Sequence, residues 1–338
     1  MPSSAVWKVA IVGTGNIAGG SERPSPDGPV KSHAQALHRH PRFSLHAAVN
    51  PNETELRAFE RTWKVPRVFP AMDDLLAEAP VDVIVLCTPD ALHFAQARAV
   101  LEADERPRVL VVEKPVCTNA DQLEELLALA PSSGVVLVVN HGRRVDPAHR
   151  RLSQRVRGGD LGRLVQGRWT YYGGWLHNGV HAVDTLRMLF GAEPECVSAR
   201  LAGSGRPDDA DLHVKLRIAG APLTLEPFDE RHYQLFEAEL RFERGRAWIR
   251  DFGERLTVEH VAENARAERE LVPEVEEPSP PGLDSPLSHL LDAVDGELRG
   301  DGSLRAAGVD LETAAGTMRL MFEACAVAQG RPAEGRRQ

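Results

Sequence analysis

The first 140 residues alternate short apolar runs with amphipathic segments. The apolar runs lack polar–apolar alternation, which is typical of strands covered on both faces. They are Val6–Val12, Phe43–Val49, Val81–Cys87, Arg108–Val112 and Val135–Asn140. Helical patterns lie between them at Glu53–Lys64, Ala91–Ala103 and Ala120–Ala130. Thr118 with Asp121 resembles a capping box that opens the last of these. The alternation predicts a doubly wound parallel sheet of the α/β class.

The pattern changes near residue 160, where longer segments alternate polar and apolar residues. These segments predict a large, mainly antiparallel sheet with one solvated face. They are Leu164–Tyr172, Asp211–Ile218, Gln234–Arg244 and Arg255–Val261. Three helices are expected in this part of the chain. The first covers Gly179–Phe190, with Asn178 as its N-cap and Gly191 at its end. The second begins at Ser285 and Pro286, after a proline- and acid-rich connector, and ends at Leu298, and the third covers Leu311–Ala328. We therefore expect an α/β domain over residues 1–140 and an α+β domain over 141–338.

Composition narrows the class of protein. A chain of 338 residues is long enough for two domains, and 40 basic against 49 acidic residues create no field that attracts nucleic acid. The sequence shows no membrane-length apolar run, no signal-peptide pattern and only four scattered cysteines, so we expect a cytoplasmic protein without membrane partners. Lysine occurs only five times. A lysine inside a motif is therefore a candidate for a chemical role, because arginine, which supplies nearly all the other positive charge, cannot give up a proton.

A glycine motif follows the first apolar run. Gly13, Gly15 and Ala18, with Asn16 and Ile17 between them, form the pattern GxGxxA, which predicts a Rossmann dinucleotide site; a plain glycine turn is the alternative. The next segment, Gly19–Lys31, is rich in proline and glycine, and a helical pattern resumes at Ser32, whose spacing to Gln35 suits a capping box. We interpret Gly19–Lys31 as an insertion, either a substrate lid or a tolerated surface loop.

The second apolar run ends at Asn50, where a ribose-binding carboxylate is expected once the insertion is subtracted. An amide can bond a ribose hydroxyl without repelling a 2′-phosphate. Because Glu53 and Glu55 lie nearby, NAD is slightly favoured, and the choice between NAD and NADP stays open.

Three more segments complete a resemblance. They are Cys87-Thr88-Pro89-Asp90-Ala91-Leu92-His93, then Glu113-Lys114-Pro115, then Gly179-Val180-His181-Ala182-Val183-Asp184. With GxGxxA, their order resembles the Gfo/Idh/MocA oxidoreductases. The resemblance implies that Thr88, Pro89 and His93 line the cofactor crevice. It also implies that Glu113 and Lys114 lie near the nicotinamide, with Pro115 fixing the turn. The second domain would supply His181 as acid/base and a sheet through which the chain forms a homodimer or homotetramer.

Oxidation of a secondary alcohol moves a hydride to the nicotinamide and a proton to a base. Lys114 would stabilise the reacting oxygen. His181 would act as base, with its pKa lowered by the start of the helix that contains it. The alternatives are a ribose or phosphate contact for Lys114 and a packing role for His181.

The sequence departs from the family at residue 177. Many family members carry DxGxH, whereas this chain has His177-Asn178-Gly179-Val180-His181. His177 could bond a substrate oxygen, relay a proton, or indicate a substrate other than a polyol. No third metal ligand is evident, so no metal is expected. Other candidate substrate contacts are Asn178, Asp184, Trp175, Tyr172 and Arg144.

These observations favour an NAD(P)-dependent oxidoreductase acting on a sugar, cyclitol or derivative. Two alternatives remain. One is a glycosidase that uses bound NAD without net consumption. The other is a catalytically silent nucleotide-binding sensor, for which the departure at His177 is the motive.

Overall fold

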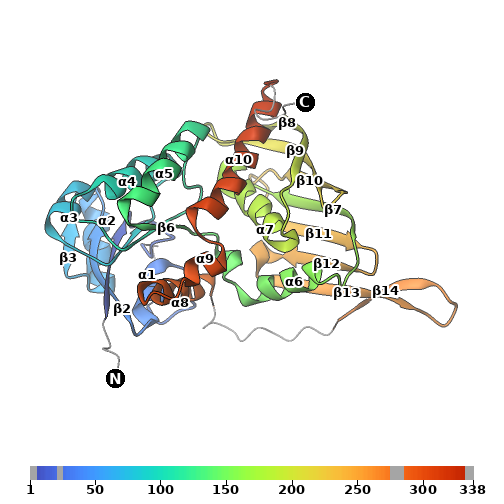
Figure 1. Cartoon of the computed structure of the whole chain (residues 1–338), viewed down its shortest axis with the longest axis horizontal. Coiled ribbons are helices and arrows are strands. Elements are labelled where there is room, and N and C mark those ends of the chain that lie inside the picture. Colours follow the sequence, from blue (N-terminus) through green and yellow to red (C-terminus); the bar gives the residue numbers. More distant parts are fainter. Residues whose placement is uncertain (1–5, 21–25, 275–284, 332–338) are drawn as a thin grey trace. The chain divides into compact units, whose positions relative to one another are not determined.

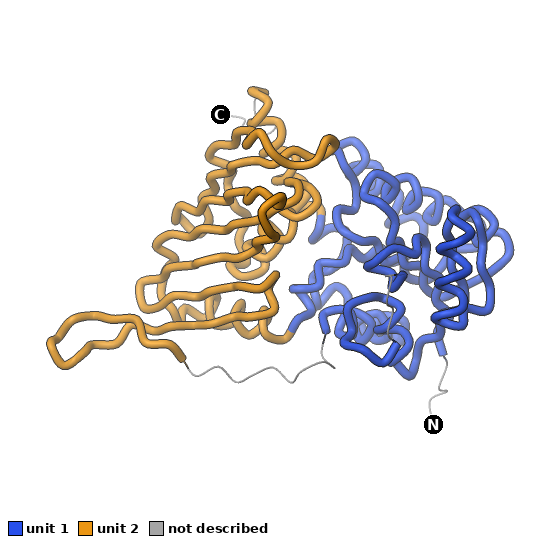
Figure 2. Tube along the Cα trace, turned by 180° about the vertical axis from the view of Figure 1, so that it is seen from behind, with its two compact units in different colours: residues 1–146, 279–314 blue, residues 147–278, 315–338 orange. Residues whose placement is uncertain are grey.

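The computed structural model describes residues 6–20, 26–274 and 285–331. The chain divides into two compact units, residues 1–146 with 279–314 and residues 147–278 with 315–338 (Figure 2). The first unit thus extends a few residues beyond the expected boundary at 140. It also contains residues 279–314, which we had expected in the second domain. Parts of the Gly19–Lys31 insertion and of the connector before Ser285 lie outside the described residues.

The first unit, in which Figure 1 labels β2, β3 and β6, is built on a parallel six-stranded sheet in the order β3-β2-β1-β4-β5-β6. Its strands are β1 (Trp7–Val12), β2 (Phe43–Val49), β3 (Arg67–Phe69), β4 (Val83–Leu86), β5 (Val109–Val112) and β6 (Val136–Val139). All four residues of β4 and of β5 are buried, as their continuous apolar character predicts. The prediction of a doubly wound sheet is confirmed. Strand β3 was not predicted, since three residues carry too little pattern.

The helices of the first unit are α1 (His33–Arg39), α2 (Glu53–Trp63), α3 (Met72–Glu78), α4 (Asp90–Glu102), α5 (Ala120–Ser133), the 3₁₀ turn η1 (Gly142–Arg144), α8 (Pro286–Leu298) and α9 (Ser303–Ala307). The helices predicted for the sequence that forms the first unit begin and end close to the predicted positions, whereas α3, η1 and α9 were not predicted. Ser32 caps α1, and Ser285 caps α8, as predicted. The predicted cap of α5 is wrong. Asn119, not Thr118, accepts the N–H of Gln122, because the Thr118 hydroxyl bonds to the Gln122 side chain instead.

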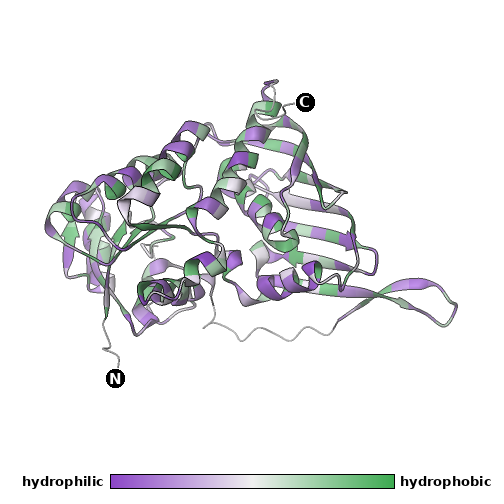
Figure 3. Cartoon of the chain, in the orientation of Figure 1, coloured by the Kyte–Doolittle hydropathy of each residue, from purple (hydrophilic) through white to green (hydrophobic). Residues whose placement is uncertain are grey.

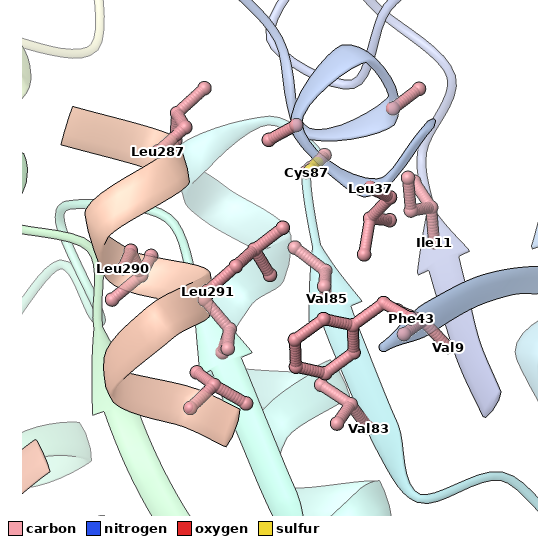
Figure 4. Packing of buried hydrophobic residues seen from close by; sticks show 14 of the residues in the cluster. Val9, Ile11, Leu37, Phe43, Val83, Val85, Cys87, Leu287, Leu290 and Leu291 are labelled. Carbon is pink, nitrogen blue, oxygen red and sulfur yellow. The ribbon is translucent and has the colours of Figure 1, made fainter. Parts of the chain in front are cut away.

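Helix α8 belongs to the first unit because its apolar face covers the parallel sheet. Leu287, Leu290 and Leu291 join the cluster that contains Val83 and Val85 (Figure 4). This packing joins residues about 200 positions apart, which no local pattern can predict.

A buried carboxylate fixes α8 from its other end. Asp295, 6% exposed, accepts hydrogen bonds from the Trp7 indole at 2.8 Å, from Arg42 at 2.6 Å and from Arg299 at 3.1 Å. Burial alone would raise the pKa of Asp295, but the bonds from Trp7 and Arg42 outweigh it and lower the pKa. The charged form of Asp295 therefore stabilises the folded state.

The second unit is built on an eight-stranded sheet in the order β14-β13-β12-β11-β7-β10-β9-β8. Its strands are β7 (Leu164–Tyr171), β8 (Glu195–Gly205), β9 (Ala210–Ile218), β10 (Ala221–Pro227), β11 (Glu237–Phe242), β12 (Gly245–Arg250), β13 (Arg255–Glu263) and β14 (Arg269–Pro273). Only the β7–β10 pair is parallel. Its strands show alternating hydropathy (Figure 3), and the expected mainly antiparallel sheet is confirmed.

The helical part of the second unit comprises α6 (Pro147–Arg157), the π-helical turn η2 (Trp175–Gly179), α7 (Val180–Phe190), the 3₁₀ turn η3 (Asp251–Gly253) and most of α10 (Leu311–Ala328). Gly191 ends α7 in the left-handed region at φ 61°, as predicted. Asn178 does not cap this helix. It lies within η2, which runs directly into α7. None of the helices in the described ranges is long and apolar enough to cross a membrane.

The Asp295 network predicts an acid-sensitive contribution to stability. Because the folded pKa is lowered, this contribution is present above the carboxyl's unfolded pKa of about 3.9 and is lost as pH falls through the folded pKa. Asp295→Asn should lower the free energy of unfolding at neutral pH by about 2–4 kcal/mol, and the difference from wild type should vanish in acid. Urea unfolding at several pH values measures both. Asp292→Asn, on the same helix but 67% exposed at its side chain, is the control and should change stability by less than about 1 kcal/mol. Equal stability of D295N and wild type at neutral pH would contradict the prediction.

Candidate functional site

The glycine motif forms an exposed turn at the carboxyl end of β1. Gly13 has φ 87°, and a Cβ there would lie 2.7 Å from the carbonyl oxygen of Cys87, so only glycine fits. Gly15, Asn16 and Ile17 are exposed, and a Cβ at Gly15 would meet nothing within 4 Å. Ala18 is fully buried beneath the turn. An open backbone turn above a small packed residue fits a dinucleotide pyrophosphate.

The segment after this turn is an insertion into a helix. The N–H groups of His33 and Ala34 donate to the carbonyls of Ile17 at 2.9 Å and Ala18 at 3.0 Å. In a continuous α-helix, each N–H donates in this way to a carbonyl of the preceding turn. The chain therefore leaves the helix after its first turn and re-enters it at α1, which supports the interpretation of Gly19–Lys31 as an insertion.

Asn50, at the end of β2, is 8% exposed and held on three sides. Its amide nitrogen donates to the hydroxyl of Thr14 and, at 3.1 Å, to a carboxylate oxygen of Glu55, and its oxygen accepts the N–H of Asn52 at 2.8 Å. Glu55, in the first turn of α2, is exposed. At the end of β2, where an acidic residue was expected and Asn50 stands instead, the carboxylate comes from Glu55 of α2.

Two turns at the neighbouring strand ends are joined by His93. This ring is fully buried, with Nδ1 2.7 Å from the carbonyl oxygen of Pro115 and Nε2 2.8 Å from that of Thr88. The Lys114–Pro115 peptide bond is cis. His93 thus does not line an open crevice, as the resemblance had implied, because both its nitrogens face inward. It fixes the turns that carry Thr88 and Lys114. Pro89 precedes α4 at its cap position.

Glu113 is buried, not exposed beside a ligand. Its Oε1 lies 2.7 Å from Nε2 of His33 and accepts a 2.7 Å hydrogen bond from the amide of Asn140. The three residues are between 2% and 7% exposed. Burial would raise the pKa of Glu113, but the bond with His33, supported by Asn140 and Lys114, lowers it. Neither His33 nor Asn140 was predicted as a site residue; the helix start at Ser32 and the strand end at Asn140 were the available signals.

In the second unit, the candidate residues surround η2. Asp209, in the β8–β9 loop, accepts the N–H groups of Leu176 at 2.9 Å and His177 at 2.7 Å. A carboxylate from a distant loop therefore caps this helix. Because η2 precedes α7 without a break, His181 lies in the second helical turn, which contradicts its expected place in the first. The helix dipole acts less on a side chain in the second turn, since the effect falls off within one turn.

The structure separates buried from accessible candidates. Trp175 is fully buried and donates its indole N–H to the carbonyl of Met321 at 3.0 Å, so it is not an open sugar platform. Asp184 is 2% exposed and accepts the Thr317 hydroxyl at 2.9 Å, which fastens α7 to α10. Arg144 is 9% exposed. Tyr172, His177, Asn178 and His181 are partly exposed, and a substrate role for them stays a prediction.

Lys114 belongs to the first unit and His181 to the second, so their meeting across a nicotinamide also stays a prediction. Within the ranges that the structure describes, no group of three or more His, Cys, Asp or Glu side chains could hold a metal ion.

Comparison with known proteins bears on this site. Residues 7–141 match an oxidoreductase family with an NAD-binding Rossmann fold. The UDP-N-acetylglucosamine 3-dehydrogenase of Acidithiobacillus ferrooxidans is 31% identical over a match covering 43% of this chain and 47% of that protein. The scyllo-inositol 2-dehydrogenase (NADP(+)) IolW of Bacillus subtilis is 27% identical, covering 42% of this chain and 45% of its own. The chain spans about half the length of the curated relatives it matches.

The fold extends the likeness over both units. The WlbA dehydrogenase from Bordetella pertussis, solved with NADH and UDP-GlcNAcA, has a TM-score of 0.76 and 21% identity over 96% of each chain. At that identity the likeness concerns the fold. Together with the glycine turn and the Glu113–Lys114–Pro115 turn, these matches show that residues 7–141 form a Rossmann domain of the Gfo/Idh/MocA family of oxidoreductases.

Proposed function

We propose that the chain is an NAD(P)-dependent oxidoreductase that transfers a hydride between the nicotinamide and a secondary alcohol or ketone of a sugar, cyclitol or sugar derivative. The observation that carries this proposal is the turn after β5. There Lys114 follows a buried carboxylate and precedes a proline fixed by His93, on the same sheet edge as the exposed glycine turn. Ligands of open α/β sheets bind at the carboxyl ends of the strands.

The bound dinucleotide would supply the hydride acceptor or donor. In this proposal the Lys114 ammonium donates a hydrogen bond to the reacting oxygen and stabilises its developing negative charge. His181 takes the hydroxyl proton in oxidation and returns it in reduction. Catalysis then depends on how firmly the lysine is held, because small displacements cost large factors in rate.

Glu113 is the positioning residue for Lys114 in this proposal. Its carboxylate is buried away from solvent, so its hydrogen bonds with His33 and Asn140 hold it in one position. Because Lys114 is the next residue, its backbone position is fixed by the same bonds. The Asn140 Oδ1 atom is buried without a hydrogen-bond partner in the described structure. An amide N–H of a bound ligand, such as that of the nicotinamide carboxamide, would satisfy it.

The cofactor preferred in this proposal is NAD. The Glu55 carboxylate, bonded to Asn50 at the end of β2, lies where the adenosine ribose of a dinucleotide is expected. A carboxylate accepts hydrogen bonds from ribose hydroxyls and repels a 2′-phosphate.

Self-association through the eight-stranded sheet is part of the proposal, as is a cytoplasmic location. This sheet carries charged residues that are already paired, including Glu239 with Arg241 on its own strand and with Arg246 on the neighbouring strand β12. A shallow hollow opens on this sheet between β7, β10 and β11. Paired charges lose less free energy than unpaired ones when a second copy covers them.

Lys114→Ala should reduce kcat by roughly 10²–10⁴-fold, since it removes the proposed charge stabilisation. The measurement is reduced-nicotinamide absorbance with a panel of polyols and keto-sugars. Lys8→Ala, an exposed lysine at the other end of the same sheet, is the control and should leave kcat unchanged. Turnover of K114A near wild type would remove Lys114 from the mechanism. Glycoside cleavage with flat absorbance would instead favour the glycosidase, and no hydride exchange with any substrate would favour the silent sensor.

Glu113→Gln should lower the free energy of unfolding by about 2–3 kcal/mol and should also reduce kcat, because a neutral amide cannot replace the carboxylate between His33 and Asn140. Urea unfolding and steady-state kinetics measure the two effects. Glu105→Gln, an exposed residue of the same unit, should change neither. Loss of stability with unchanged kcat would show that Glu113 serves the fold but does not position Lys114.

Glu55→Gln should raise the preference for NADP over NAD by about 10-fold, since it removes one negative charge near the expected 2′-phosphate. Dissociation constants from quenching of intrinsic tryptophan fluorescence measure this ratio. Glu53→Gln is the matched control, because its 83% exposed side chain lies on the same helix and pairs with Arg57. An equal change in both variants would rule out a specific role for Glu55.

A further inference from the structure

The second unit gathers several loops at one end of its sheet. Strands β7 and β10 are parallel and in register, with Pro227 opposite Tyr171, so the segments that follow them leave the sheet together. Strand β12 also ends there, because Ile249 lies opposite Ala238 near the start of β11. The loops after β7, β10 and β12 therefore surround η2, which carries His177.

Four side chains from these loops form what we call the ring-binding cluster: Tyr172, Asn178, Glu230 and Phe252. The Asn178 side chain hydrogen-bonds to the Tyr172 hydroxyl. The Tyr172 and Phe252 rings meet edge to face, with centroids 5.7 Å apart and an interplanar angle of 85°. Oε2 of Glu230 and Nδ2 of Asn178 lie 3.0 Å and 3.1 Å from the point where a Cβ of Gly173 would stand. Gly173, at φ 70°, leaves this space open.

Phe252 is presented by an unusual turn. Asp251 at φ 50° and Phe252 at φ 58° are consecutive non-glycine residues in the left-handed region, and Gly253 follows at φ 95°. This conformation is unfavourable for a residue with a Cβ, and it persists where the surroundings impose it. It leaves the Phe252 ring 44% exposed beside Tyr172. Residues held in such a conformation cluster at ligand-binding and active sites, so this turn is a candidate for a ligand-binding role.

Glu230 brings a carboxylate to the cluster, beside Asn178 and close enough to Tyr172 to act on its pKa. Burial raises the pKa of Tyr172 most, Glu230 raises it further, and the opposing effects of Asn178 and Arg206 are smaller. The nearby Arg231 is already paired with Asp229 at 2.5 Å. The cluster thus offers an aromatic wall, an amide and a carboxylate, a combination that accepts hydroxyl hydrogens and disfavours anions.

We propose that the ring-binding cluster is a substrate subsite that binds an uncharged, hydroxyl-bearing ring against Phe252 and selects against sugars that carry a carboxylate or phosphate there. Glu230 accepts hydrogen bonds from ring hydroxyls, and so replaces the carboxylate that residue 177 lacks. This inference rests on the proposed function, since it specifies which members of the proposed substrate class the chain accepts.

The test is equilibrium binding of the NAD-loaded full chain to matched pairs of neutral and anionic sugars, such as glucose with glucuronate, together with myo-inositol, by isothermal titration calorimetry. Wild type should bind a neutral ring at least about 10-fold tighter than its anionic counterpart. Glu230→Gln should reduce that ratio about 10-fold, whereas Glu263→Gln, an exposed carboxylate at the far end of β13, should preserve it. Tighter binding of the anionic sugars by wild type, no binding of any neutral ring, or an unchanged ratio in E230Q would overturn the proposal.

Phe252→Gly separates binding from folding. Glycine removes the ring and relieves the left-handed backbone, so affinity for neutral rings should fall about 10-fold while Tm does not fall. Ala267→Gly makes the same backbone change at φ 62° in the β13–β14 turn and should leave affinity unchanged. Neutral-ring affinity in F252G equal to wild type would exclude the aromatic wall. Hydride transfer with wild-type KM in E230Q and F252G would leave the proposed function standing without this subsite, whereas neutral-ring binding without hydride transfer would leave the subsite standing without the reaction.

Discussion

The architecture of the first unit depends on one buried ion. A carboxylate removed from water costs several kcal/mol unless hydrogen bonds replace its solvent, and Glu113 has this problem at the end of β5. His33 and Asn140 solve it from two other elements, α1 and the end of β6. The constraint works in both directions, because the same bonds that satisfy Glu113 fix the start of α1 and the edge of the sheet. The residue after Glu113 is the lysine of the motif, so the hydrogen bonds of His33 and Asn140 to Glu113 also fix the backbone beside Lys114.

The helical turn after the glycine motif and helix α1 are also joined through the residues that hold Glu113. His33 both bonds to Glu113 and donates its N–H to Ile17, so one residue joins the glycine turn, the re-entry of the chain and the buried carboxylate. An insertion at this point is tolerated because the helix on its far side is anchored independently by the Ser32 cap and by this imidazole. His93 repeats the device one strand away, where it joins the turns after β4 and β5. Two imidazoles therefore hold together the sheet edge at which the cofactor is proposed to bind.

In the second unit, two carboxylates from other loops lie near η2, where His177 stands in place of an expected aspartate. The DxGxH pattern of the sequence analysis would place that aspartate at residue 177. Around it, the structure brings Asp209 to the backbone of η2 and Glu230 to the side of Asn178. Asp209 bonds main-chain N–H groups and so serves the helix, whereas Glu230 lies beside Asn178 and acts on the pKa of Tyr172. The two negative charges come from separate loops, which divides between them the structural and recognition roles that one residue could have combined.

The sequence by itself determined the parallel sheet, most helix boundaries, the glycine turn and the position of Lys114, because each depends on a periodicity or on neighbours along the chain. It also indicated the mainly antiparallel character of the second sheet. Tertiary structure alone decided the rest. The burial of Trp175 and Asp184 depends on α10, about 140 residues away, and the inward turn of His93 depends on where the Pro115 carbonyl lies. Helix α8 joins the first unit because Asp295 meets Trp7 and Arg42. Such contacts have no local signature, since the energy that selects them arises only when distant residues exclude water together.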